Sequence, residues 1–206
     1  MIIEKIYIIH YKYLEDRKKY LDKILNKLSI PYEFIINDKD SDNYKMKDID
    51  KYYKYDSNVF NKRLSISEIC VTISHFEVYQ KILNDNLENV LIVEDDAIFT
   101  DNFLENLKKI TDELNDFDMC FISECCNLHI TNTDERYIYK SDTSRCTSGY
   151  ILNRRNLKHI INTLPFQYPI DWHLNTINDK MKLKYFWSEP CIIIQGSESI
   201  YKSNLR

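Results

Sequence analysis

The residues best suited to chemistry are three consecutive carboxylates, Glu94, Asp95 and Asp96, which directly follow the apolar run Val90–Val93. A short Val/Leu/Ile run of this kind is typical of a strand buried on both faces of a parallel sheet. Adjacent carboxylates repel one another and lose solvation at a buried strand end unless a cation lies among them. Mg²⁺ and Mn²⁺ are often held by one or two carboxylates together with substrate phosphates. The pattern therefore indicates a metal–diphosphate site of the kind a nucleotide-sugar enzyme needs, and a solvated acidic turn is the alternative.

The position of the triplet also predicts how its members divide their work. Side chains alternate along a strand, so Glu94 and Asp96 should point to one side and Asp95 to the other. Ligands of open α/β sheets bind outside the carboxyl ends of the strands. We expect Asp96 to ligate the metal, Asp95 to contact the metal or the ribose, and Glu94 to support the ligands or brace the loop.

The elements that must position these carboxylates can be predicted from hydrophobic periodicity. A strand over 5–10, a helix over 15–28 and a strand over 32–36 form a βαβ unit, which favours a parallel sheet. Ser65 and Glu68 fit a capping box, so a helix should begin there and end near 84–86. Residues 37–63 are polar and are expected to form a loop whose tyrosines either stack on a sugar or base or have no role. Further strands are expected at 90–94, 118–123, 137–140, 146–152, 184–187 and 191–195, and further helices around 103–114, 154–163 and 172–181.

Composition excludes several classes of protein. The 206 residues predict a single domain over 1–206, and 44% hydrophobic residues exclude global disorder. The net charge of −4 argues against a dedicated nucleic-acid binder. Only two glycines occur, so neither a dinucleotide fingerprint nor a P-loop is present. No apolar run reaches the length of a transmembrane helix, and the N-terminus is a poor signal peptide.

Six cysteines are present, none in a CxxC pair and none clustered in sequence with histidines. This spacing is typical of buried free thiols in a reducing compartment. We therefore expect a soluble cytoplasmic protein, in the host cytoplasm if the chain is viral.

Several segments, in their order and spacing, resemble glycosyltransferase family 25, the lipooligosaccharide-type galactosyl- and glucosyltransferases that include the collagen glycosyltransferase domains. LSISEICVTISH at Leu64–His75 resembles the family's L-T-x-G-E-I-G-C-x-x-S-H, and LIVEDDA at Leu91–Ala97 resembles its I-x-E-D-D-V. The other matching segments are Ile6–Tyr11 with Asp16 and Arg17, Phe117–Ile122, Thr147–Leu152 and Pro169–Leu174. The resemblance extends from Ile6 to about Ile200. Ser67 and Cys70 replace the two glycines of the first block, and His10 stands where asparagine is usual.

The resemblance implies a GT-A fold, which is a Rossmann-like α/β fold with a mixed, mostly parallel sheet flanked by helices. It implies a UDP-hexose donor, glucose or galactose, and Mn²⁺ or Mg²⁺ held by the triplet in place of a D-x-D motif. Transfer is expected to be inverting, to a glycan, a lipooligosaccharide or a hydroxylysine-type acceptor. The alternatives are a nucleotide-sugar or glycan-binding protein without catalysis, and a Rossmann-like metal-dependent phosphohydrolase. The first strand ends in His10-Tyr11 rather than a nucleophilic aspartate, which counts against the phosphohydrolase.

Candidate roles follow for residues outside the triplet. Inverting transfer needs a carboxylate to take the acceptor proton, and Asp171 is the first candidate, Glu124 the second, although Asp171 could also be a helix cap. Arg17 suits phosphate or uracil, or is a surface residue. Glu68 and His75 are either donor-site residues or a cap and a core histidine. Gln195 is a candidate metal ligand; Ser199, Lys202 and Arg206 are weaker candidates for the diphosphate, and Asp118 is expected to be structural.

Overall fold

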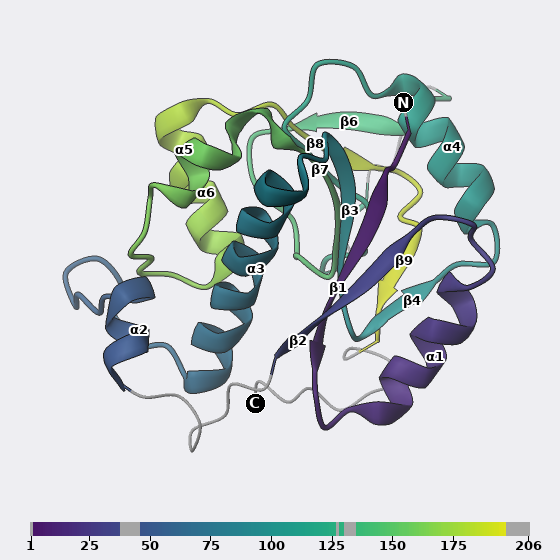
Figure 1. Ribbon diagram of the computed structural model, residues 1–206. Helices are drawn as coiled ribbons and strands as arrows, with labels where there is room; N and C mark the ends of the chain where they lie inside the picture. Colours follow the sequence, from purple (N-terminus) through teal and green to yellow (C-terminus); the bar gives the residue numbers. More distant parts are fainter. Residues whose placement is uncertain (1, 38–45, 127, 130–134, 197–206) are drawn as a thin grey trace.

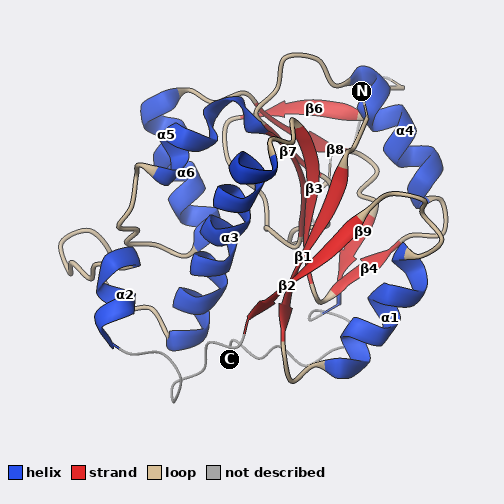
Figure 2. Ribbon diagram, viewed as in Figure 1, coloured by secondary structure: helices blue, strands red, loops and turns tan. Residues whose placement is uncertain are grey.

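The computed structural model describes residues 2–37, 46–126, 128–129 and 135–196, with the backbone alone for 46–48. A central sheet separates two layers of helices (Figures 1 and 2). One layer holds α2 (Met46–Tyr52), α3 (Ile66–Asp85), α5 (Leu157–Ile161) and α6 (Ile170–Met181). The other holds α1 (Glu15–Leu25), α4 (Phe103–Glu113) and a small two-stranded sheet. A 3₁₀ turn, η1, spans Arg154–Asn156.

The large sheet has the strand order β2-β1-β3-β7-β5-β8-β6. Its pairings are parallel for β1 with β2 and β3 and for β5 with β8, whereas β7 and β6 are antiparallel to their neighbours. Five of the seven described strands therefore run in one direction, which confirms a mixed, mostly parallel sheet. The strands are β1 (Lys5–Tyr11), β2 (Tyr32–Asn37), β3 (Asn89–Glu94), β5 (Met119–Phe121), β6 (Ile138–Ser141), β7 (Gly149–Asn153) and β8 (Tyr185–Ser188).

The acidic strand β3 is buried on both faces, as its sequence predicts. Val90 and Ile92 belong to the core under α3, whereas Leu91 and Val93 belong to the core under α1 and α4. Two separate apolar layers thus hold β3 from both sides and fix the place where its carboxylates emerge.

Helix α3 begins at the predicted capping box. Ser65 Oγ accepts from the Glu68 amide at 3.2 Å, and the Glu68 carboxylate accepts from the Ser65 amide at 2.7 Å. The helix ends at Asn86, whose left-handed φ of 56° closes it. Its buried face includes Ile73 and Phe76, and α3 packs on the sheet against β1 and β2.

Two expectations about the elements are wrong. The segment 37–63 is not all loop, because α2 lies within it and Ile49 and Tyr53 are buried in the core. Strand β9 (Ile193–Gln195) does not close the large sheet but pairs antiparallel with β4 (Ala97–Phe99), directly after the acidic triplet. A Cβ on Gly149 would lie 2.6 Å from Ile193 Cδ1, so this glycine leaves room for β9 to cross the large sheet.

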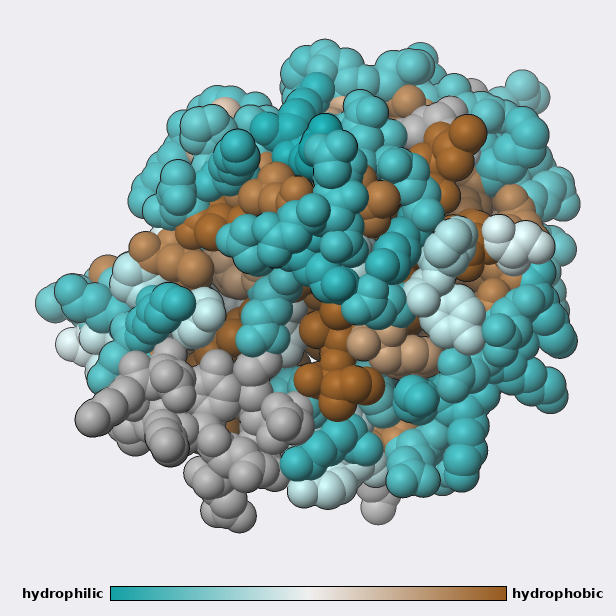
Figure 3. All heavy atoms as spheres, in the orientation of Figure 1, coloured by the Kyte–Doolittle hydropathy of each residue, from teal (hydrophilic) through white to brown (hydrophobic). Residues whose placement is uncertain are grey.

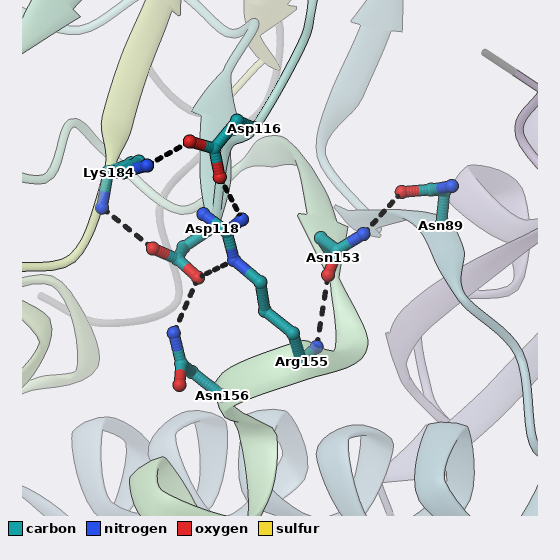
Figure 4. A network of polar contacts seen from close by, with 7 residues as sticks. All are labelled: Asn89, Asp116, Asp118, Asn153, Arg155, Asn156 and Lys184. Atoms are coloured by element: carbon teal, nitrogen blue, oxygen red, sulfur yellow. Dashed lines mark hydrogen bonds and ion pairs between the residues drawn. The ribbon is translucent and has the colours of Figure 1, made fainter.

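At the amino-terminal edge of β5, a polar network joins three chain segments (Figure 4). Asp118 accepts from Arg155 Nε at 2.6 Å, from Asn156 Nδ2 at 2.7 Å and from the Lys184 amide at 2.7 Å. Asp116 pairs with the outer nitrogens of Arg155 and Lys184. Burial alone would raise the pKa of Asp118, but these hydrogen bonds outweigh it and lower the pKa. Asp118 therefore has a structural setting, as expected.

The face of the molecule seen in Figure 3 is mostly hydrophilic, with separate hydrophobic groups. Within the described residues, no helix combines the length and the apolarity needed to cross a membrane.

Candidate active site

The acidic triplet emerges where the parallel strands end and β7 begins. Glu94 is the last residue of β3, and Asp95 and Asp96 form the turn into β4. His10 and Tyr11 end the neighbouring strand β1. Side chains from β1, β3 and the entry to β7 therefore meet at one edge of the sheet, as expected for a ligand site of an open α/β fold.

Asp95 faces the α1 side, where both of its carboxylate oxygens are engaged. Oδ1 accepts from Arg17 Nη1 at 2.8 Å, and Oδ2 lies 2.8 Å from the Tyr11 amide and 3.0 Å from His10 Nδ1. Arg17 is buried, so the expectation of a surface arginine is wrong. Removing one partner of a buried pair leaves an uncompensated charge, so Arg17 and Asp95 hold the β1–α1 connection together.

Glu94 faces the opposite side, toward α3. One of its oxygens, Oε1, accepts from Thr147 Oγ1 at 2.7 Å and lies 3.3 Å from His75 Nε2. His75 Nδ1 lies 2.8 Å from the Tyr150 hydroxyl, which lies 2.8 Å from the Tyr79 hydroxyl. The predicted alternation of Glu94 and Asp95 is thus confirmed, and a buried polar chain connects Glu94 to the centre of α3.

Proton counting assigns a direction to this chain. Burial, with contributions from Tyr79 and Glu94, raises the pKa of Tyr150 well above its usual range, so its phenol keeps its proton. The hydroxyl of Tyr150 can therefore accept from Tyr79 and donate to His75 Nδ1, and His75 Nε2 lies toward Glu94. The contacts of this chain thus lead from Tyr79 to the Glu94 carboxylate.

Asp96 lies beside the small sheet. The residue is 5% exposed, and its backbone carbonyl accepts from the Gly196 amide at 2.8 Å. Gln195 pairs with Ala97 in the β4–β9 ladder. The structure therefore brings Gln195 next to Asp96, whereas Ser199, Lys202 and Arg206 lie outside the described residues.

The donor atoms of this edge fit a divalent cation held by few protein ligands. Glu94 and Asp95 turn to opposite faces, and in the described part of the chain the triplet does not form a group of three converging metal ligands. Asp96 and Gln195 are neighbours at the end of the β4–β9 ladder, and each carries a side-chain oxygen of the kind that Mg²⁺ and Mn²⁺ prefer. Mg²⁺ and Mn²⁺ are commonly held by one or two carboxylates with water and substrate phosphates, and this donor set is of that kind.

Asp171 lies on the first turn of α6 and shares the space in front of Glu94. Burial raises the pKa of Asp171, the charge of Glu94 raises it further, and His75 opposes this. Its Oδ1 accepts from the Trp172 amide at 2.9 Å, and Ser144 Oγ donates to its carbonyl at 2.6 Å. Pro169 is the N-cap residue, so the interpretation of Asp171 as the cap is wrong.

Comparison with known proteins identifies the chain. Residues 3–174 match the sequence model described as glycosyltransferase family 25 (LPS biosynthesis protein). The chain belongs to glycosyltransferase family 25.

Two family 25 relatives differ in how much of their length the chain spans. Procollagen galactosyltransferase 1-A of Xenopus laevis is 23% identical over 87% of this chain and 32% of its own length. Lipooligosaccharide biosynthesis protein lic2B of Haemophilus influenzae is 25% identical over 75% of this chain and 61% of its own length. The chain thus spans about a third of the curated relatives it matches first.

One solved structure shows the fold of this family 25 chain. It is a glycosyltransferase involved in the glycosylation of the major capsid of PBCV-1, with a TM-score of 0.50 and 9% identity. The match covers 92% of this chain and 93% of that one. The expected GT-A-like α/β fold is thereby supported.

The two remaining candidate residues, Glu68 and Glu124, make their contacts outside the acidic triplet. Glu68 is engaged in the capping box and lies 3.5 Å from Lys62 Nζ, so helix capping accounts for its position. Glu124 follows β5, and its amide donates to the Ile193 carbonyl at 2.8 Å. Burial, with the charges of Glu124 and Glu189, raises the pKa of the Cys191 thiol to about 11. Glu124 therefore lies near enough to Cys191 for its charge to act on the thiol.

The expectation of free thiols throughout is wrong for two cysteines. Cys125 and Cys146 form a disulfide that joins the segment after β5 to the segment before β7. Cys70 and Cys120 are buried free thiols as expected, and Cys126 is exposed. Sequence spacing gave no sign of the pair, because the two cysteines meet only when β5 and β7 lie side by side.

Sequence reasoning also missed three residues of this edge. His10 was noted only as a departure from the family pattern, yet it contacts Asp95. Tyr150 and Thr147 both join the chain that ends on Glu94. A histidine at the end of a buried strand was the one available signal, because the tyrosine and threonine are ordinary strand residues.

Proposed function

We propose that this chain transfers a hexose, galactose or glucose, from a UDP-sugar to a hydroxyl of a glycan, with inversion and with a divalent metal. The observation that carries the proposal is the arrangement of three carboxylates, those of Glu94, Asp96 and Asp171, around the end of β3. Asp96 lies next to the β4–β9 ladder that holds Gln195, whereas Glu94 contacts His75 of α3 and its charge acts on Asp171 of α6. The names of the relatives, a procollagen galactosyltransferase and a lipooligosaccharide biosynthesis protein, support a hexose donor and a glycan or hydroxylated acceptor.

The two sets of groups fit the two halves of such a transfer. The acceptor oxygen attacks C1 of the hexose, the bond from C1 to the UDP oxygen breaks, and the acceptor proton passes to Asp171. A raised pKa suits Asp171 to this role, since a base is most effective when its pKa lies near the working pH. Glu94 is fixed by His75 and Thr147, so it orders the floor of the site.

Asp96 and Gln195 are the residues that would hold the metal. When bound, the metal would neutralise the charge that develops on the leaving diphosphate. Arg17 and Asp95 lie behind the edge and fix the β1–α1 connection against which the donor would rest.

The test is UDP release from a panel of UDP-sugars, with and without Mn²⁺, for the wild type, Asp96→Asn and the exposed control Asp101→Asn. We expect release from one UDP-hexose that requires Mn²⁺, disappears in Asp96→Asn and persists in Asp101→Asn. Binding of UDP without release from any donor, with or without acceptor, would indicate a binding protein. Phosphate release from a simple phosphomonoester without nucleotide would indicate a phosphohydrolase.

A further inference from the structure

Three aromatic side chains meet beside Asp171 and form what we term the aromatic platform, namely Phe60, Tyr168 and Trp172. The ring centroids of Phe60 lie 5.3 Å from those of Tyr168 and 5.7 Å from those of Trp172, both in edge-to-face geometry. Phe60 packs against the core, and the Tyr168 hydroxyl donates to the Val59 carbonyl at 3.0 Å. The core contact of Phe60 and the hydrogen bond of Tyr168 therefore hold the platform in place.

Trp172 remains 56% exposed despite these contacts. The other tryptophan, Trp187, is 8% exposed, with the Arg145 guanidinium 3.4 Å from its ring centroid. Exposure of a large aromatic surface loses hydrophobic stabilisation, so an exposed and rigidly held indole is a marker of a binding surface.

The place of the platform points to the acceptor. Trp172 directly follows Asp171 on the first turn of α6, and the Asp171 carboxylate is electrostatically coupled to Glu94 and His75. Asp96 and Gln195, the candidate metal residues, lie next to the β4–β9 ladder, and neither is among the groups that act on Asp171. A molecule resting on Trp172 would thus present its groups to Asp171 rather than to the diphosphate end of the site.

The chemistry of the indole of Trp172 and the neighbouring carboxylate of Asp171 indicates which class of ligand would bind there. A hexopyranose ring has an apolar face of C–H groups and a rim of hydroxyls, so it can stack on an indole while one hydroxyl reaches the adjacent carboxylate. The segment 54–63 beside the platform contains Lys54, Lys62 and Arg63 but only one acid, Asp56, and Glu68 pairs with Lys62 at 3.5 Å, which leaves a net charge of +1. This local charge disfavours a lysine-rich peptide and leaves a neutral sugar unaffected.

We propose that the aromatic platform is the acceptor subsite, and that a hexopyranose ring of a glycan acceptor stacks on Trp172 with its nucleophilic hydroxyl at Asp171. The inference rests on the proposed glycosyl transfer. It narrows the acceptor from a glycan or hydroxylated peptide to a saccharide, and it makes Trp172 a determinant of acceptor specificity.

The presence of two tryptophans permits a direct binding test that needs no donor. Lactose, N-acetyllactosamine and a hydroxylysine-containing peptide are titrated separately into the wild type, Trp172→Phe and Trp187→Phe, and tryptophan fluorescence is followed. We expect at least one of the two disaccharides to change the emission of the wild type and of Trp187→Phe, and to leave Trp172→Phe unchanged. No response to either disaccharide, or a response to the peptide alone, would overturn the proposal.

A kinetic test covers the case in which Trp187→Phe does not fold. With the disaccharide that is accepted, Trp172→Ala should raise KM for the acceptor about tenfold, and Trp172→Phe should restore part of this loss. An unchanged acceptor KM in Trp172→Ala, or a rise in the donor KM alone, would overturn the proposal. Loss of donor hydrolysis is the result expected for Asp96→Asn. For the Trp172 variants, the quantity measured is the acceptor KM and not donor hydrolysis. Failure of the platform is therefore distinguishable from failure of the proposed transfer.

Discussion

At the scale of single residues, the two nitrogens of His75 serve different neighbours. Nε2 meets Glu94, and Nδ1 meets Tyr150. A glutamine can place an amide N–H near the Nε2 position, whereas an asparagine reaches only the Nδ1 position. We expect His75→Gln to keep most of the transfer activity and His75→Asn to lower kcat by about 10–100-fold, as for other residues that orient a ligand group. Steady-state kinetics of the two variants measures the difference.

The same pair of variants separates positioning from packing. Since both lose the imidazole, which stacks on Tyr150 at 5.8 Å, both should lose similar thermal stability. If His75→Gln and His75→Asn lost equal activity in parallel with equal loss of Tm, His75 would be a core residue with no bearing on Glu94.

Asp171 links activity to pH in a direction that its environment fixes. Burial and the charge of Glu94 raise its pKa, so the protonated carboxyl is favoured in the folded state. As pH rises from the unfolded pKa to this raised pKa, the fold loses the stability that the protonated carboxyl gave it, and above the raised pKa the base is active and this loss is complete. We expect Asp171→Asn to lower kcat by about 10²–10⁴-fold and to raise the urea midpoint slightly at neutral pH.

Two measurements check the prediction for Asp171. The pH dependence of kcat/KM in the wild type should show an acidic limb, and urea unfolding should show that Asp171→Asn gains most at higher pH. An active Asp171→Asn enzyme with the same acidic limb would move the role of base to another group, with Glu124 the next to test.

The sequence predicted the directions of two side chains of the triplet, but not their contacts. Strand periodicity placed Glu94 and Asp95 on opposite faces, because alternation is a local property. Their partners could not be predicted, since Arg17 and Asp95 are 78 positions apart and meet only through the pairing of β1 with β3. The contact of His10 with Asp95 could not be predicted either, because it spans 85 positions.

At the scale of elements, the network around Asp118 joins β5 to β8 and to the turn after β7. Replacing Asp118 with alanine leaves the Arg155 guanidinium, the Asn156 amide and the Lys184 N–H without their shared acceptor. We expect Asp118→Ala to lower the free energy of unfolding by about 2–4 kcal/mol. Chemical denaturation followed by circular dichroism would measure this loss.

Asp116 provides a matched control, because it pairs with the same Arg155 and Lys184 at a side-chain exposure of 62%. Asp116→Ala should cost only about 0–1 kcal/mol, as for exposed ion pairs. Since the pKa of Asp118 is lowered, its stabilisation exists above the unfolded pKa and disappears as pH falls through the folded value. Equal losses in the two variants, or a loss for Asp118→Ala that does not shrink in acid, would contradict the prediction.

The main helices and strands could be predicted from sequence because each repeats a buried face over many residues. Helix α3 carries both a capping box and a long apolar face, so its start and end were predicted closely. Strand β9 lies within the predicted strand 191–195, but β4 has only three residues, too few for a periodicity to appear, so the pairing of the two strands could not be predicted. Helix α2 lies in a polar segment, and only the burial of Ile49 and Tyr53 reveals its tertiary role.

At the scale of the whole molecule, the fold divides support from chemistry. The sheet lies between two layers of helices (Figure 2), and apolar clusters fill both of its faces. The polar network at Asp118 (Figure 4) precedes β5, whereas the acidic triplet begins at Glu94, where β3 ends, so the two lie at opposite edges of the sheet. The composition predicted a single folded unit with a substantial core. It could not predict the disulfide between the segment after β5 and the segment before β7, because only the sheet order brings these two strands together.

That link, between Cys125 and Cys146, is the last feature with a measurable consequence. The two cysteines are 21 positions apart, and closing a loop of this size stabilises a fold by about 3 kcal/mol through the entropy of the unfolded chain. We expect Cys146→Ala to lose about this amount. The exposed Cys126 lies outside the disulfide, so Cys126→Ser should change stability by less than about 0.5 kcal/mol. Thiol titration in denaturant without reductant should then count four free thiols in the wild type, since six cysteines include one pair. Six reactive thiols, with equal stability of Cys146→Ala and Cys126→Ser, would show that the purified chain does not hold the bond.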